Sequence, residues 1–205
     1  MWTNAFFKTT DPKVTVVGGF PLLPSWWSRA YEYSWAAQFA GKDLVVADMG
    51  AGWSGRPFKE YLAQTCREVY AVDRDERFLE LPNDYPNMKY VIADFENEVP
   101  IPLVDRIFCI SVLEDLTNYE KALTEFKRLL KPDGLIVITC DSQYDPSRPL
   151  TKYPGVSFKN LFNAVIDSGL KFYEGTIDFH APENAVYHEE WNLACWHGVL
   201  THAKS

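Results

Sequence analysis

The chain has 205 residues, of which 47% are hydrophobic and 23% are charged, and this composition excludes a disordered chain and favours one globular domain. Its 28 acidic residues outnumber its 20 lysines and arginines, and the net charge of −8 counts against a nucleic-acid partner bound through phosphates. The first residues lack the pattern of a secretory signal, and no apolar run approaches the ~20 residues that cross a bilayer. We therefore expect a cytoplasmic protein with no membrane partner.

Residues 1–42 precede the first predicted strand and are expected to form an N-terminal helical extension. A helix is predicted from about Trp26 to Ala40, and its first part is rich in Trp and Tyr. Because aromatic faces bind sugar rings, planar acceptors or a cationic sulfonium, this segment is a candidate lid, with substrate-binding candidates at Arg29, Tyr31 and Trp35. The alternative is that the same rings pack on the sheet as part of the core.

From residue 43 onward, short runs rich in Val and Ile alternate with helix-like stretches, which is typical of an α/β fold with a mostly parallel sheet. The predicted strands are 43–48, 68–73, 89–94, 105–112 and 134–140. Two later runs predict an antiparallel pair at the sheet edge, which makes about seven strands. Residues 43–205 are expected to form a single domain, and the Pro-rich connection after the fifth strand adds Tyr144 as a substrate candidate.

Capping residues predict where several helices begin and end. Pro57 suits a first helical position, and Thr117 with Glu120 forms a candidate capping box. A turn at residues 131–134 is expected to end the helix that follows this box. Ser157 is predicted to cap a later helix that Gly169 closes.

A glycine-rich segment lies where the first of these strands gives way to a helix. The residues from Gly50 to Gly55 match the G-x-G-x-x-G pattern of dinucleotide-binding proteins, so one hypothesis is an NAD-binding oxidoreductase that uses Gly50, Gly52 and Gly55. Against it, Pro57 places the helix start after Gly55, and Asp48 would set a carboxylate beside a pyrophosphate. A carboxylate at this position suits a cationic ligand better.

Five motifs in order, within about residues 43–140, resemble the class I S-adenosylmethionine-dependent methyltransferases of the small-molecule group. The D-x-G-x-G loop of that family is matched by Asp48, Gly50 and Gly52, and the acid that ends the next strand is matched by Asp73. VIADFEN, CISVLEDL and RLLKPDGLIVIT resemble the motifs of the third, fourth and fifth strands. The resemblance implies a Rossmann-like, doubly wound sheet with an antiparallel edge strand, and S-adenosyl-L-methionine as the cofactor.

The same resemblance implies which residues bind the cofactor: close backbone approach at the glycines, ribose hydroxyls on Asp73, and the adenine near Asp94. The full set of implied cofactor-binding residues is Asp48, Gly50, Ala51, Gly52, Asp73, Arg74, Asp94, Phe95 and Ser111. The chain departs from the family pattern at Ser54, where glycine is frequent, and at Asp115, where histidine is frequent.

The acceptor is expected to be a small molecule, with a hydroxyl of a sugar or another metabolite as the candidate group. The motifs of amino-methylating and cytosine-methylating DNA enzymes are absent after the fourth strand. No catalytic residue is assigned, and His180 and His188 are the candidates for a base. His188-Glu189-Glu190 has a poor ligand spacing, and no C-x-x-C pair occurs, so no metal is expected. A non-catalytic binding module stays open as an alternative, as do a monomer and a homodimer.

Overall fold

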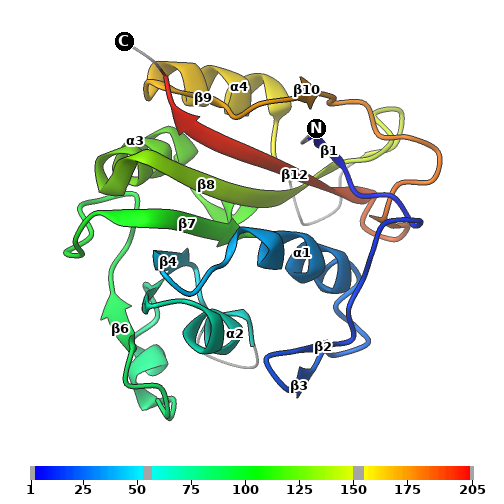
Figure 1. Ribbon diagram of the computed structural model, residues 1–205. Helices are drawn as coiled ribbons and strands as arrows, with labels where there is room; N and C mark the ends of the chain where they lie inside the picture. Colours follow the sequence, from blue (N-terminus) through cyan, green and yellow to red (C-terminus); the bar gives the residue numbers. More distant parts are fainter. Residues whose placement is uncertain (1–2, 53–56, 150–154, 204–205) are drawn as a thin grey trace.

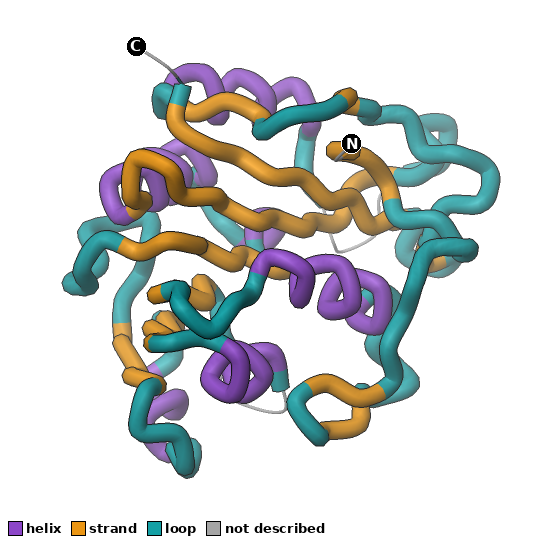
Figure 2. Tube along the Cα trace, viewed as in Figure 1, coloured by secondary structure: helices purple, strands orange, loops and turns teal. Residues whose placement is uncertain are grey.

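The structure is a computed structural model that describes residues 3–52, 57–149 and 155–203. One large mixed sheet runs through the molecule, with helices on both of its faces (Figure 1; Figure 2). The helices are α1 (Arg29–Ala36), α2 (Phe58–Thr65), α3 (Tyr119–Leu129) and α4 (Phe158–Asp167), with short 3-10 turns η1 (Ala37–Phe39), η2 (Glu76–Glu80) and η3 (Leu113–Asp115). The longer strands are β1 (Thr3–Phe6), β4 (Val45–Met49), β5 (Glu68–Asp73), β6 (Met88–Ile92), β7 (Val104–Ile110), β8 (Leu130–Gln143) and β12 (Leu193–His202). The short ones are β2 (Val16–Val17), β3 (Phe20–Pro21), β9 (Leu170–Phe172), β10 (Thr176–Ile177) and β11 (Tyr187–His188).

The five strands predicted from residues 43 to 140 form the parallel part of the sheet, in the order β8-β7-β4-β5-β6. Chain order reverses between β4 and β7, which is the place where open α/β sheets bind ligands, beyond the carboxyl ends of the strands. β12 runs antiparallel beside β8, with Cys195 opposite Asp141, and β9 pairs antiparallel with β12. The expected fold, a mostly parallel doubly wound sheet with antiparallel strands at one side, is confirmed.

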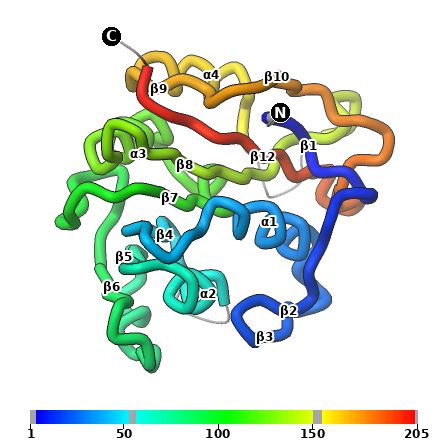
Figure 3. Tube along the Cα trace, viewed as in Figure 1, coloured from blue at the N-terminus to red at the C-terminus, as the bar shows by residue number. Residues whose placement is uncertain are grey.

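The sheet also contains more strands than predicted, because short pairings extend it beyond β12. β1 pairs with β12, with Ala5 opposite His197, and β10 pairs with β1 (Figure 3). Part of the N-terminal segment therefore belongs to the sheet. Strands of two to four residues carry no usable alternation of apolar and polar side chains, and for that reason the sequence does not indicate them.

Two hydrophobic layers hold the helices on the sheet. α3 and α4 bury Leu123, Phe126 and Leu161 against one face. α1 and α2 cover the opposite face with residues such as Tyr33 and Leu62. Both faces of β4 and β7 are therefore covered, which explains why these strands read as nearly continuous apolar runs.

The predicted helix ends are met in part. Ser157 caps α4 by accepting a hydrogen bond from the Asn160 N–H, and Gly169 follows that helix with a φ of +74°. The capping box at Thr117 is wrong, because the cap of α3 is Asn118, whose side chain accepts from the Lys121 N–H at 3.1 Å. The predicted turn at residues 131–134 is also wrong, since these residues continue from Leu130 as the first part of β8.

A buried ion pair fixes α1 against the carboxyl ends of β7 and β8. Glu32 is completely buried, and its carboxylate accepts a 2.5 Å bond from the guanidinium of Arg29. The same carboxylate accepts from the hydroxyls of Ser28 (3.0 Å), Ser111 (2.5 Å) and Thr139 (2.5 Å). Although burial opposes ionisation, Arg29 and these hydroxyls hold the pKa of Glu32 below its usual value, so the carboxylate stays charged.

We expect Glu32→Ala to lower the free energy of unfolding by about 3–5 kcal/mol, because it leaves the buried guanidinium of Arg29 without its counter-charge. Glu32→Gln, which keeps the shape and one acceptor oxygen, should cost less. Urea unfolding followed by circular dichroism measures both, with the exposed Glu80→Ala as the control. A loss in Glu32→Ala no larger than that of the control would show that the ion pair does not hold α1.

Candidate functional site

A cavity of 310 Å³ lies at the carboxyl edge of the parallel strands, at the point where chain order reverses. Its walls come from the segments that follow β4, β5, β6 and β7. The lining residues are Gly50, Gly52, Asp73, Arg74, Asp75, Asp94, Phe95, Val112, Asp115 and Leu116. Four separate strand ends thus contribute to one site.

The glycine loop after β4 needs glycine for two physical reasons. Gly50 has a φ of +80°, and a Cβ built on it would lie 2.5 Å from a methyl group of Val112. Gly52 also has a positive φ, of +72°. A residue with a side chain at Gly50 would therefore be strained and would clash with the segment that follows β7.

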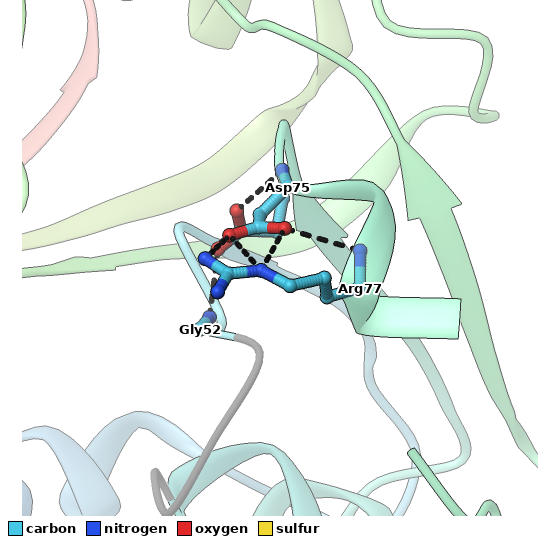
Figure 4. Close-up of polar contacts among 4 residues, drawn as sticks. Gly52, Asp75 and Arg77 are labelled. Carbon is cyan, nitrogen blue, oxygen red and sulfur yellow. Dashed lines mark hydrogen bonds and ion pairs between the residues drawn. The ribbon is translucent and has the colours of Figure 1, made fainter. Parts of the chain in front are cut away.

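Asp73, the last residue of β5, joins this loop to the next one. Its carboxylate accepts hydrogen bonds from the N–H of Gly52 at 2.8 Å and from the N–H of Asp75 at 3.0 Å. Figure 4 shows these polar contacts, with Gly52, Asp75 and Arg77 labelled. The carboxylate is therefore held in one orientation at the cavity wall by backbone groups from both loops.

Asp75 is fixed in turn by Arg77. Its carboxylate accepts from the Arg77 Nε at 2.9 Å and from the Arg77 N–H at 3.1 Å (Figure 4). The hydrogen bonds from the guanidinium hold the pKa of Asp75 below its usual value. A second ionised carboxylate is thus placed beside Asp73.

The charge of the lining selects the kind of ligand that fits. The lining contains four carboxylates and one guanidinium, that of Arg74, and because Arg77 pairs with Asp75, the carboxylates of Asp73, Asp94 and Asp115 remain against Arg74. Such a lining favours hydroxyl donors and a cationic centre and repels a pyrophosphate. The NAD hypothesis loses its support here, and Gly55, on which it also relied, lies outside the described residues.

Six of the nine predicted cofactor-binding residues line this cavity: Gly50, Gly52, Asp73, Arg74, Asp94 and Phe95. Asp48 does not, because it is a buried interior residue of β4, paired in register with Ala71 and Phe108. Ala51 is buried in the core, and Ser111 donates its hydroxyl to Glu32. These three residues are not in the cavity lining, and their part in cofactor binding stays a prediction.

Four lining residues were not predicted: Asp75, Val112, Asp115 and Leu116. The sequence motif after the fourth strand pointed instead to Ser111, which is buried. The register of that segment depends on the close packing of Val112 against Gly50, which no sequence pattern shows. In the sequence, Asp115 stands out only because the family frequently has histidine at this position.

The predicted substrate residues lie elsewhere. Tyr31 is buried against Phe7, and Trp35 packs edge-on to Phe39. Arg29 is engaged by Glu32, and Tyr144 stacks on Tyr187 with ring centroids 4.4 Å apart. None of the four belongs to the cavity lining, and the rings of α1 take the core role that the alternative reading gave them.

The two candidate histidines also lie outside the cavity lining. The side chain of His180 is 98% exposed beside Asp178, and His188 is stacked on Trp191 with ring centroids 3.9 Å apart. Histidine is a natural candidate for a base because its pKa suits proton transfer near neutral pH. The structure offers carboxyl groups for that task instead.

Glu114 and Asp141 form a buried acidic pair at the ends of β7 and β8. The Oε2 of Glu114 and the Oδ1 of Asp141 are shielded from solvent, and neither has a hydrogen-bond partner among the described residues. Burial and the nearby charge of Glu32 raise the pKa of Asp141 to about 7. Burial and the charge of Asp141 raise the pKa of Glu114 well above its usual value. The pair therefore retains a proton at neutral pH.

Glu114 connects this acidic pair to the cavity. It lies in η3, between the lining residues Val112 and Asp115. Asp141 faces α1 on the same side of the sheet as Thr139, the strand residue that donates to Glu32. The pair and the Glu32 ion pair thus belong to one polar cluster beneath the carboxyl edge.

Comparison with known proteins shows a methyltransferase domain in part of the chain. Residues 47–138 match the sequence profile of a methyltransferase domain. No curated protein matches the chain. Within the described part of the chain, no helix is long and apolar enough to span a membrane.

Many solved structures share the fold. A TehB-like S-adenosylmethionine-dependent methyltransferase from Corynebacterium glutamicum superposes with a TM-score of 0.61 at 19% identity, over 83% of this chain and 86% of that one. A methyltransferase from Aquifex aeolicus gives 0.62 at 20% identity, over 84% and 92% of the two chains. The 4+2 cyclase SpnF gives 0.69 at 10% identity, over 100% and 89%. The profile match and the shared fold show that residues 47–138 form a methyltransferase domain of the Rossmann-like type, and such a domain implies S-adenosylmethionine as the cofactor.

Proposed function

We propose that this enzyme transfers a methyl group to a hydroxyl of a small molecule, with Asp141 as the general base. The observation that carries this proposal is the buried Glu114–Asp141 pair, because Asp141, near the end of β8, has a pKa raised to about 7 and Glu114 adjoins the cavity lining. A general base is most effective when its pKa lies near the operating pH.

The residues of the 310 Å³ cavity fit the cofactor and would hold it. S-adenosylmethionine supplies an activated methyl group on a cationic sulfur. Gly50 and Gly52 allow the backbone to approach the ligand closely, and Asp73 can accept the ribose hydroxyls while its orientation is held by two N–H groups. Asp94 and Phe95 stand at the end of the next strand, where the family places the adenine.

Asp141 and Glu114 have different roles in the proposed chemistry. Methyl transfer from a sulfonium needs no acid for the leaving group, so alignment supplies much of the rate. A hydroxyl acceptor, by contrast, has to lose its proton, and the Asp141 carboxylate accepts it. Glu114 keeps its own proton, and Arg29 is already neutralised by Glu32 at 2.5 Å. Burial and the charge of Glu32 outweigh the attraction of Arg29, so the carboxylate of Asp141 is basic enough to accept a proton.

A small acceptor is supported by the charge of the site. The cavity at this edge is lined mainly by acidic and apolar residues, and the chain carries a net charge of −8. These features oppose the binding of a polyanion at the same edge.

Cofactor placement is tested by calorimetric titration with S-adenosylhomocysteine and NAD. We expect the first to bind and Asp73→Ala to weaken it at least about tenfold, since the substitution removes a charge-assisted acceptor. The exposed Asp84→Ala, which makes the same change outside the cavity, should leave the affinity unchanged. Equal affinities for the two variants would remove Asp73 from the cofactor site.

The role of Asp141 is tested by kinetics with a panel of hydroxyl, amine and thiol acceptors. Asp141→Asn should lower kcat for a hydroxyl acceptor by about 10²- to 10⁴-fold, whereas Glu114→Gln, which resembles the protonated acid, should retain most of the activity. The wild-type rate should rise with pH through about 7, and this limb should vanish in Asp141→Asn. Full activity of Asp141→Asn, or turnover of amines alone, would contradict the proposal.

The ionisation of Asp141 should also change how the stability of the protein depends on pH. The pKa of Asp141 is raised from 3.8 to about 7, so the folded state binds this proton more tightly than the unfolded chain does. Its ionisation therefore lowers stability as pH rises from about 4 to 7. We expect Asp141→Asn to melt at a higher temperature than wild type at pH 8, with the difference shrinking or reversing at pH 4. A melting temperature that is lower at both pH values would contradict this assignment.

A further inference from the structure

We infer that the opposite edge of the sheet carries a second binding site, for an organic phosphate. A groove of 980 Å³ lies where β7 and β8 begin, between the end of α3 and the strands β9 and β12. In Figure 1 these segments meet on the left, near the C-terminal end of β12 and away from α1. The cofactor cavity lies at the carboxyl ends of the same parallel strands, so the two sites are on opposite edges of the sheet.

The charge of the groove is opposite to that of the molecule. Arg106, Lys127, Arg128 and Lys171 line it, against the acidic Asp133 and Glu174. Of these cations, Arg128 is engaged by Glu125 at 2.6 Å. A net positive groove on a chain with a charge of −8 is a local feature that attracts anions and not a reflection of overall composition.

Arg106 is the residue that most clearly lacks a partner. Its Nη1 donates to the Asp105 carbonyl at 2.6 Å, but its Nε is buried with no acceptor among the described residues. The neighbouring carboxylate of Asp105 is occupied elsewhere, by Lys131 at 2.9 Å and by the Val45 N–H at 2.8 Å. An arginine stays charged under all ordinary conditions, and Arg106 lines the groove without forming an ion pair with any described carboxylate, so its guanidinium favours an anion in the groove.

The rest of the lining indicates what such an anion is attached to. Leu103, Leu130, Leu135 and Tyr173 contribute apolar surface beside the cations, and half of Leu103 is exposed. Inorganic phosphate would leave this surface in water, whereas a phosphate ester with an apolar or aromatic body would cover it. The ligand class is therefore an organic phosphate whose phosphate group is held by Arg106 with Lys171.

The experiment is a calorimetric titration with phenyl phosphate, inorganic phosphate and phenol. We expect phenyl phosphate to bind more tightly than inorganic phosphate, phenol not to bind, and the affinity for phenyl phosphate to fall as salt is raised. Arg106→Gln and, separately, Lys171→Gln should each weaken phenyl phosphate at least about fivefold, and Arg106→Lys should recover part of the loss. Lys121→Gln, an exposed charge change on the same α3 helix that ends at the groove, is the matched control.

Several outcomes would overturn the inference: no saturable binding of phenyl phosphate, the same affinity in Arg106→Gln, Lys171→Gln and the control, or equal binding of phenol. Competition is the remaining test. Phenyl phosphate should bind equally well in the presence of saturating S-adenosylhomocysteine and in Asp73→Ala, and displacement by S-adenosylhomocysteine would place it in the cofactor cavity instead. Melting curves establish that each variant is folded, and having two independent variants keeps the test valid if one of them is not.

Discussion

The buried carboxylate of Glu32 is the interaction on which the packing of α1 against the sheet depends. It takes up one guanidinium and three hydroxyls, and in doing so it ties α1 to residues at the ends of β7 and β8. Ser111, one of its donors, has a φ of +46°, a conformation unusual for a residue with a side chain, and this residue directly precedes the Val112 that packs on Gly50. Burial and the negative charge of Glu32 raise the pKa of the neighbouring Asp141, and burial with the charge of Asp141 raises that of Glu114. The Glu32 carboxylate thus fixes the position of α1 and also raises the pKa of a carboxyl group at the end of β8.

The cofactor side is built differently, from backbone groups that are fixed before a ligand arrives. Asp73 is oriented by two N–H groups, and Gly50 is locked by its fit against Val112. A site whose donors and acceptors are already in place loses little entropy on binding. The two halves of the site meet at the segment from Ser111 to Asp115, which lines the cavity on one side and carries Glu114 on the other. A substitution in this short segment would therefore affect the binding of both ligands.

Much of the fold and of the cofactor side follows from local sequence. The five parallel strands are contiguous apolar runs, and Asp73 and Asp94 stand where such runs end, so strand position alone brings them together. Asp48 fits the same rule but lies one residue short of the end of β4, and a shift of one residue turns a strand side chain to the other face. Glu32 could not be recognised, because in the sequence it is one acid in an aromatic helix. Its role comes from Ser111 and Thr139, which are 79 and 107 residues away along the chain.

The pairing of β1 with β12 sets the order in which the molecule can be completed. Ala5 lies opposite His197, so the earliest strand of the chain has no partner in the sheet until one of the last has been made. In the same way, the hydrogen bond from Thr139 to Glu32 cannot form until the strand that carries Thr139 is in place. Contacts between such distant residues close long loops and form slowly. The central parallel strands can assemble from neighbouring segments, whereas the N-terminal forty residues dock late. The parallel strands that carry the glycine-lined cavity can therefore form first, and the part of the sheet beyond β8 is completed when the two ends of the chain come together.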